Sequence, residues 1–252
     1  MVMSHTFAVP SALPVASRVP SGLNTTRHTR SVYAAGAMGA VHGEAGTGKT
    51  FAVDEALASA PSLDACWLSF PSRPTMRLVA TSLLAALTRS ASPDRNRFEA
   101  TAQLVDVLSH GRRVIVIDEA QRLNRECIEF LRHLHDHPLT TFALVLVGGD
   151  GCWEVLSREP MLRSRIYRRV VFRSLSRRQV LAMIREYHPL YREIADELVD
   201  FIDDHFAHGN FRNWAAFTRS AQDLCQRTGR PTLDEAIARN VFALHGGTAG
   251  AD

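Results

Sequence analysis

The sequence predicts an α/β domain built on a doubly wound parallel sheet, followed by a small all-helical domain. Over residues 36–174, short apolar runs typical of buried strands alternate with segments of helical periodicity, which is the pattern of a parallel sheet between helices. Over residues 175–245, apolar residues recur only at helical spacing. We expect residues 1–35 to form an N-terminal extension and residues 246–252 a flexible tail.

Five runs of the α/β part have the composition of strands. VIVID (114–118) and FALVLVGG (142–149) are continuously apolar, as expected for strands buried on both faces of a parallel sheet. The other expected strands cover residues 37–43, residues 64–70 and a short run ending at Phe172. Expected helices cover residues 49–59, 76–87 and 98–109 and the stripe through Ile128, Leu131 and Leu134. In the helical part, four apolar stripes begin at Val180, Ile194, Trp214 and Leu233.

The composition is that of a globular protein, with 46% hydrophobic and 22% charged residues. No apolar run is long enough to indicate a membrane span. The N-terminus is interrupted by Pro10, Pro14 and Pro20 and lacks the basic and apolar regions of a signal peptide. We therefore expect a cytoplasmic protein with no membrane partner. The net charge of +3 permits binding to nucleic acid without requiring it.

The cysteines and a group of histidines do not indicate a metal site. The four cysteines lie far apart and show no C-x-x-C spacing, so we expect buried, reduced thiols. His133, His135 and His137 alternate along the chain. Residues two positions apart on a helix point to different faces, so we expect a solvated helix end rather than a metal site.

Residues 43–50, GEAGTGKT, match the phosphate-binding pattern G-x-x-x-x-G-K-[ST] and lie between a predicted strand and a predicted helix. Glycines let the backbone wrap closely around a phosphate with its N–H groups pointing inward. The helix that follows adds its positive N-terminal end. The alternative is a chance glycine-rich turn. The predicted nucleotide-binding residues of this segment are Gly43, Glu44, Ala45, Gly46, Thr47, Gly48, Lys49, Thr50 and Phe51.

Lys49 is the only lysine in the sequence. Its compact ammonium group suits the β- and γ-phosphates of ATP or ADP, whereas a planar guanidinium is too broad for the loop. The hydroxyl of Thr50 is a candidate ligand for Mg²⁺. The cofactors predicted by this segment are therefore ATP or ADP and Mg²⁺.

Asp118 and Glu119 follow the buried run 114–118 at its carboxyl end, where ligands bind in open α/β sheets. Asp118 is the candidate for holding Mg²⁺, mainly through water, and Glu119 is the candidate general base that orients the attacking water. The alternative is an acidic pair that caps the next helix.

In this order, the loop, IDEAQ (117–121), LVLVGG (144–149), LRSRI (162–166) and the helical end resemble the AAA+ family of P-loop ATPases. The stretch SFPSRPTMRLVATSLLAAL (69–87), with IDEAQRL (117–123), FLRHLHD (130–136) and VLVGG (145–149), is similar to transposition ATPases of the TniB, TnsC and phage Mu B type. The similarity spans about residues 30–225. It implies an AAA+ P-loop NTPase fold in which the helical domain forms a lid.

The resemblance implies two further arginines at the nucleotide. Arg165 matches the position of the arginine finger, which a neighbouring subunit supplies, with Arg163 as the alternative finger. Arg212 matches the sensor-2 position of the lid. The alternatives are an ordinary surface arginine for Arg165 and, for the segment around Arg212, a helix start made by Gly209 and Asn210.

One position departs from the family pattern. Where the family places a polar residue that senses the γ-phosphate, this sequence has Gly149, followed by Asp150. Either Asp150 substitutes for it or sensing is weak, which would favour slow hydrolysis or a protein that mainly holds ATP.

Arg73, Thr75 and Arg77 lie where related ATPases project loops toward duplex DNA, and arginines there can contact phosphates without reading sequence. The alternative is a solvated helix start. The resemblance therefore implies an ATPase that assembles on duplex DNA as a ring or helical filament and recruits or regulates a transposase. Alternatives are a replication initiator or helicase loader, a secretion ATPase, although no membrane-spanning C-terminal segment is present, and a non-enzymatic scaffold that keeps nucleotide as a structural ligand.

Overall fold

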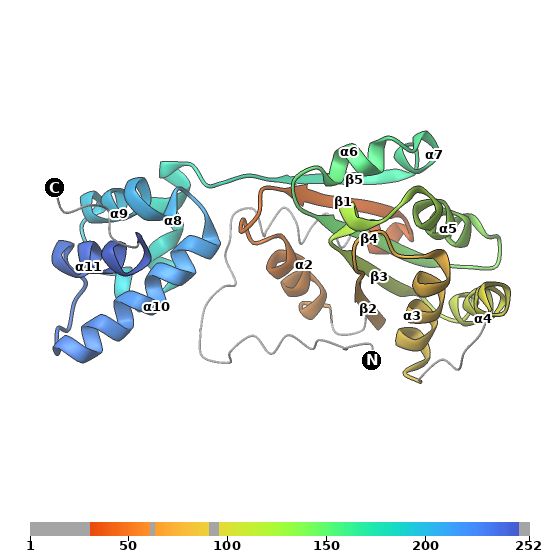
Figure 1. Cartoon of the computed structure of the whole chain (residues 1–252), viewed down its shortest axis with the longest axis horizontal. Helices are drawn as coiled ribbons and strands as arrows, with labels where there is room; N and C mark the ends of the chain where they lie inside the picture. The colour runs from red at the N-terminus through yellow and green to blue at the C-terminus, as the bar shows by residue number, and fades with distance from the viewer. Residues whose placement is uncertain (1–30, 61–63, 91–95, 247–252) are drawn as a thin grey trace. The chain divides into compact units, whose positions relative to one another are not determined.

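The computed structural model describes residues 31–60, 64–90 and 96–246, which form two compact units. One unit holds the sheet and ends at Phe172, and the other is helical and consists mainly of the residues from Arg173 onward. Figure 1 shows the elements of each unit. Most of the expected N-terminal extension and of the expected tail lies outside the described residues.

The sheet has five parallel strands in the order β2-β3-β4-β1-β5 (Figure 1). This arrangement confirms the predicted doubly wound α/β fold, because the strands are parallel and the first strand, β1, lies inside the sheet between β4 and β5, where the strand order reverses. The last strand is longer than predicted and reaches back to Ile166. The strands are β1 (Met38–Gly43), β2 (Asp64–Ser69), β3 (Arg113–Asp118), β4 (Phe142–Gly148) and β5 (Ile166–Phe172).

Alternate residues of the central strands pack into two separate cores, one on each face of the sheet. Ile115 and Ile117 of β3 belong to the core that includes residues of α3 (Met76–Thr88), α4 (Arg97–Ser109) and α5 (Arg125–Asp136). Val114 and Val116 belong to the core that includes residues of α2 (Lys49–Ala58). Helices therefore cover both faces, which explains why these runs are continuously apolar.

Local capping places the starts of three helices. The side chains of Thr75, Asn96 and Asn124 accept hydrogen bonds from the first turns of α3, α4 and α5. Three further elements of the unit with the sheet were not predicted, because they are too short to show a periodic pattern: η1 (Ala120–Arg122), α6 (Cys152–Ser157) and α7 (Pro160–Arg163).

The helical unit contains all four predicted helices and packs around aromatic side chains. Trp214 stacks edge-on against Tyr191 with ring centroids 5.5 Å apart, and its Nε1–H donates to Asp203 Oδ1 at 3.1 Å. The elements are α8 (Arg177–Tyr187), η2 (Pro189–Tyr191), α9 (Asp196–Ile202), η3 (Asp203–Ala207), α10 (Phe211–Thr228) and α11 (Glu235–Gly246).

All four cysteines are free and buried, as predicted. Within the described residues, no group of three or more histidine, cysteine or acidic side chains is placed to hold a metal ion. The prediction of a solvated helix end was wrong for His135. Its ring packs against Phe142 with centroids 5.2 Å apart, and its Nε2–H donates to the Gly36 carbonyl at 3.0 Å. In the part of the chain that the structure describes, no helix is long and apolar enough to cross a membrane.

Candidate nucleotide-binding site

The strand register brings the predicted site residues of the α/β unit to one edge of the sheet. His42 of β1 lies opposite Gly148 of β4, and Leu146 of β4 lies opposite Ile117 of β3. The next residues along β1 and β3, Gly43 and Asp118, therefore leave the sheet at the same carboxyl edge. This is where ligands bind in open α/β sheets.

The glycine loop begins with a close approach between two strands. Gly43 has a φ of +139°, and a Cβ atom there would lie 1.9 Å from the Phe172 carbonyl oxygen of β5. Gly46 and Gly48 also have positive φ values, +79° and +88°. L-amino acids with side chains rarely adopt these conformations, so the path of the loop depends on its glycines.

Lys49 lies at the inner side of the loop. Its side-chain amine donates to the carbonyls of Gly43, at 2.8 Å, and Glu44, at 2.5 Å, and the residue is only 8% exposed. A cation that is this deeply buried needs polar partners, which the loop backbone provides. The arrangement holds a positive charge directly against the segment predicted to surround phosphate.

Thr50 and Asp118 are 68 residues apart in the sequence but meet in the fold. The Thr50 hydroxyl donates to Asp118 Oδ2 at 3.2 Å, and the Glu119 N–H donates to Asp118 Oδ1 at 2.8 Å. Burial raises the pKa of Asp118, and these two hydrogen bonds offset part of the rise. A neighbouring cation would favour the carboxylate form.

The donor set fits Mg²⁺. A hydroxyl oxygen and a single carboxylate are hard oxygen ligands, and Mg²⁺ is commonly held by one or two such groups together with water and substrate phosphates. Thr50 and Asp118 would hold the ion, and the bound ion would neutralise negative charge on the phosphates.

Glu119 lies next to this pair and has an uncommon backbone conformation. Its φ is +55°, in the left-handed region, and its side chain is 43% exposed. The carboxylate accepts a hydrogen bond of 2.5 Å from Gln121 Nε2 and lies 3.7 Å from Arg122 Nε. Its role as general base stays a prediction.

Arg165 lies at the opposite edge of the sheet from the glycine loop. It precedes β5, whose first residue, Ile166, lies opposite Met38 of β1, whereas its last residue lies opposite Gly43. Seven strand residues at about 3.3 Å each separate the two edges by roughly 20 Å. Since an arginine side chain is much shorter than this, Arg165 does not contact the loop of its own chain.

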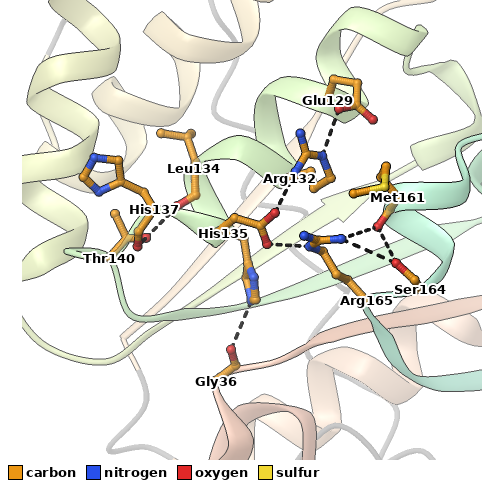
Figure 2. A network of polar contacts seen from close by, with 11 residues as sticks. Gly36, Glu129, Arg132, Leu134, His135, His137, Thr140, Met161, Ser164 and Arg165 are labelled. Atoms are coloured by element: carbon orange, nitrogen blue, oxygen red, sulfur yellow. Dashed lines mark hydrogen bonds and ion pairs between the residues drawn. The ribbon is translucent and has the colours of Figure 1, made fainter.

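The guanidinium of Arg165 is held in a fixed orientation by its neighbours (Figure 2). Nε donates to Asp136 Oδ1 at 2.6 Å, and Nη1 donates to the Met161 carbonyl at 3.0 Å. Asp136 also pairs with Arg132 at 2.7 Å, and Arg132 in turn pairs with Glu129 (Figure 2). Partial burial raises the pKa of Asp136, but the two arginines outweigh this effect and hold the pKa below its ordinary value.

The other predicted contact residues have structural partners. Thr75 caps α3 by accepting from the Leu78 N–H at 3.2 Å, while Arg73 and Arg77 are exposed around it. In the helical unit, Asn210 caps α10 by accepting from the Arg212 N–H at 3.0 Å. The helix-start interpretation thus holds for Thr75 and Asn210. The roles of Arg212 in nucleotide binding and of residues 73–77 in DNA binding stay predictions.

Sequence reasoning missed two side chains at this edge of the sheet. His42, directly before the loop, accepts a hydrogen bond from Arg169 Nε at 2.7 Å, and the Arg169 guanidinium lies 4.2 Å from the centre of the Trp153 ring. Gln121, the last residue of IDEAQ, contacts both Glu119 and the backbone of Gly149. The signal for Gln121 was present in the motif, but its contact with residue 149 depends on the strand order.

Residues 34–156 match the sequence family described as AAA domain. No curated protein sequence matches this chain significantly. Among solved structures, Cdc6p from Pyrobaculum aerophilum aligns with a TM-score of 0.78 at 18% identity, over 96% of this chain and 71% of that one. The ORC1 protein of Aeropyrum pernix, solved in complex with DNA, aligns with a TM-score of 0.71 at 19% identity, over 94% and 68%. The RuvB branch migration motor of Thermotoga maritima aligns with a TM-score of 0.60 at 18% identity, over 88% and 68%.

A glycine loop at the carboxyl edge of a parallel sheet is the arrangement of the P-loop NTPase fold. Within that class, the strand order, the matched domain and the similar structures define the AAA-type fold, with a helical unit at its C-terminal end. At these identities the solved structures bear on the fold alone.

Buried histidines in the α/β unit predict a loss of stability in mild acid. Burial, followed by the charge of Arg169, holds the pKa of His42 below 6.5, and burial does the same for His135. Below pH 6.5 the unfolded chain therefore binds more protons than the folded chain. We expect the free energy of unfolding to fall between about pH 7.5 and pH 5.5, by up to about 1.4 kcal/mol per pH unit for each of these histidines. Urea denaturation at several pH values measures this.

The matched variant is His135→Gln, whose side-chain amide can still donate to the Gly36 carbonyl but does not titrate. Its stability should depend less steeply on pH than that of the wild type. If the free energy of unfolding depends on pH equally steeply in the two proteins, His135 is not held neutral by the fold.

Proposed function

We propose that this protein is an Mg²⁺-dependent ATPase that works as an AAA+ switch. The observation that carries the proposal is the contact between Thr50 and Asp118, 3.2 Å apart at the end of the glycine loop. It joins a candidate phosphate-binding loop to a candidate metal-binding carboxylate. Glu119, the residue after that carboxylate, is the proposed general base, which distinguishes an enzyme from a scaffold that only keeps nucleotide.

Replacing the loop lysine tests nucleotide binding. Lys49→Ala removes the only ammonium group from the loop, and charge-assisted hydrogen bonds are worth about 1.5–3 kcal/mol each, so ATP affinity should fall by about 10- to 100-fold. Titration calorimetry with ATP and Mg²⁺ measures this. Wild-type protein that shows no Mg²⁺-dependent affinity for ATP or ADP would refute the proposal.

Glu119→Gln is the companion variant for hydrolysis. It should bind ATP as the wild type does and turn it over about 10²- to 10⁴-fold more slowly, which is the usual contribution of a general base. Equal and negligible turnover by both proteins would favour the scaffold.

The position of Arg165 supports hydrolysis between subunits. The arginine lies roughly 20 Å from the glycine loop of its own chain, a distance set by the length of β5. Asp136 and Met161 engage Nε and Nη1 and thereby fix the plane of the guanidinium. We propose that it reaches the γ-phosphate bound by a neighbouring copy in a ring or helical filament.

Arg165→Ala should leave ATP binding within about twofold and lower hydrolysis by about 10³-fold or more, because an arginine finger stabilises charge only in the transition state. Arg163→Ala tests the alternative finger and should hydrolyse ATP normally if Arg165 is the finger. Mixing Arg165→Ala with Lys49→Ala protein should restore part of the activity, since one chain supplies the loop and the other the finger. A loss of ATP binding in Arg165→Ala would contradict the assignment.

Two biological roles fit a DNA-associated AAA+ switch. The similarity of the fold to Cdc6p and to the DNA-bound ORC1 protein favours a replication initiator. The motifs at residues 69–87 and 117–121 favour a regulator that recruits a transposase to target DNA. A neighbouring reading frame that encodes an integrase-like catalytic core would favour the second role.

Both roles involve binding to duplex DNA, and the transposase-recruiting role predicts ATP-dependent binding without strict sequence preference. Electron microscopy with a slowly hydrolysed ATP analogue should show regularly coated duplex that is absent without nucleotide. Arg73→Ala and Arg77→Ala should each weaken binding and reduce its salt dependence by about one released ion. Arg227→Ala, an exposed arginine paired with Asp223 on α10, is the control. If the affinity for duplex DNA is the same with and without the ATP analogue, the protein is not an ATP-dependent switch.

A further inference from the structure

Gln121 joins two parts of the candidate site that the sequence treats separately. It lies in η1, directly after the strand that ends at Asp118. Its Oε1 accepts a hydrogen bond from the Gly149 N–H at 3.1 Å, and its Nε2 donates to Glu119 Oε2 at 2.5 Å. One side chain therefore connects the end of β4 to the proposed general base.

The two contacts fix the orientation of the amide. A backbone N–H can only donate and a carboxylate can only accept, so Oε1 must face Gly149 and Nε2 must face Glu119. A glutamate at position 121 would satisfy the Gly149 N–H but would place negative charge against Glu119. Among the common side chains of this size, an amide is therefore the group that serves both partners.

The local packing leaves room for this side chain. A Cβ atom at Gly148 would lie 2.5 Å from Gln121 Oε1 and 2.3 Å from Cys152 Sγ, so a larger residue there would displace both. At Gly149, in contrast, the nearest atom to an added Cβ is Gln121 Nε2, at the ordinary contact distance of 3.5 Å. Asp150 is exposed, and Gln121 rather than Asp150 occupies the space beside Gly149.

We propose that Gln121 is a positioning residue for ATP hydrolysis, which orients the Glu119 carboxylate and takes the place of the polar side chain missing at position 149. The Glu119 carboxylate is half-exposed and has two contacts described above. The hydrogen bond from Gln121 Nε2, at 2.5 Å, is much closer than the ion pair with Arg122 Nε, at 3.7 Å, so Gln121 is the tighter restraint on its orientation. Because its other contact is with Gly149 at the end of β4, Gln121 links the carboxylate to the carboxyl edge of the sheet, where the glycine loop begins. This inference rests on the proposed role of Glu119.

Single-turnover hydrolysis, measured beside ATP affinity, tests the proposal. Gln121→Ala should lower the hydrolysis rate by about 10- to 100-fold, a part of the effect of a general base, and leave the ATP dissociation constant within about twofold. Gln121→Glu, nearly the same size, should be at least as slow although it keeps the acceptor for Gly149. Gln222→Ala, which removes a half-buried glutamine that contacts His188 on the helical unit, is the matched control and should hydrolyse ATP normally.

A double-mutant cycle separates positioning from general destabilisation. If Gln121 acts through Glu119, then adding Gln121→Ala to Glu119→Gln should leave the residual rate unchanged. Two results would overturn the inference, provided that Glu119→Gln alone still lowers the rate. One is a Gln121 variant that hydrolyses ATP as fast as the wild type. The other is a Gln121→Ala change that lowers the rate by the same factor in the wild type and in Glu119→Gln. If Glu119→Gln itself has no effect, the proposed base is wrong and this inference falls with it. Should Gln121→Ala not fold, the near-isosteric Gln121→Glu gives the same comparison.

Discussion

The alignment of neighbouring strand ends is the constraint on which the candidate site depends. β1 and β3 are not neighbours in the sheet, and the register of each with β4, which lies between them, sets how their ends are aligned. That register places Thr50 of α2 beside Asp118 of β3 and brings Gly149 within reach of Gln121. A slip of one residue would also turn the core face of a strand toward the opposite helices. The packing that stabilises the sheet and the geometry of the site are therefore specified together.

The length of the sheet separates two groups of candidate site residues within one unit. The carboxyl edge carries the loop, its lysine and the acidic pair, whereas the amino edge of β5 carries Arg165 and its ion pairs with Asp136. A parallel sheet keeps these edges a strand length apart. Arg165 therefore cannot reach the glycine loop of its own chain, which is why the arginine finger proposed above has to act on the nucleotide of a neighbouring copy.

The sequence predicted most of the fold because its central strands are continuous apolar runs and its helices have clear stripes. The P-loop and the Asp118-Glu119 pair were found because their residue types and spacing are specific. Contacts that depend on strand order were not predictable: Gln121 meets a residue 28 positions away, and Arg165 meets one 29 positions away. The inward packing of His135 was missed for a related reason, since its partner Gly36 lies 99 positions away in the chain.

The burial of Lys49 has a chemical consequence. The sequence contains one ε-amino group, and it lies beneath the loop backbone with 8% of the residue exposed. Reagents and enzymes that acylate lysine, and cross-linkers that join amines, have no other side chain to react with in this sequence. Any such modification of a side chain would report directly on how accessible the glycine loop is, with no background from surface lysines.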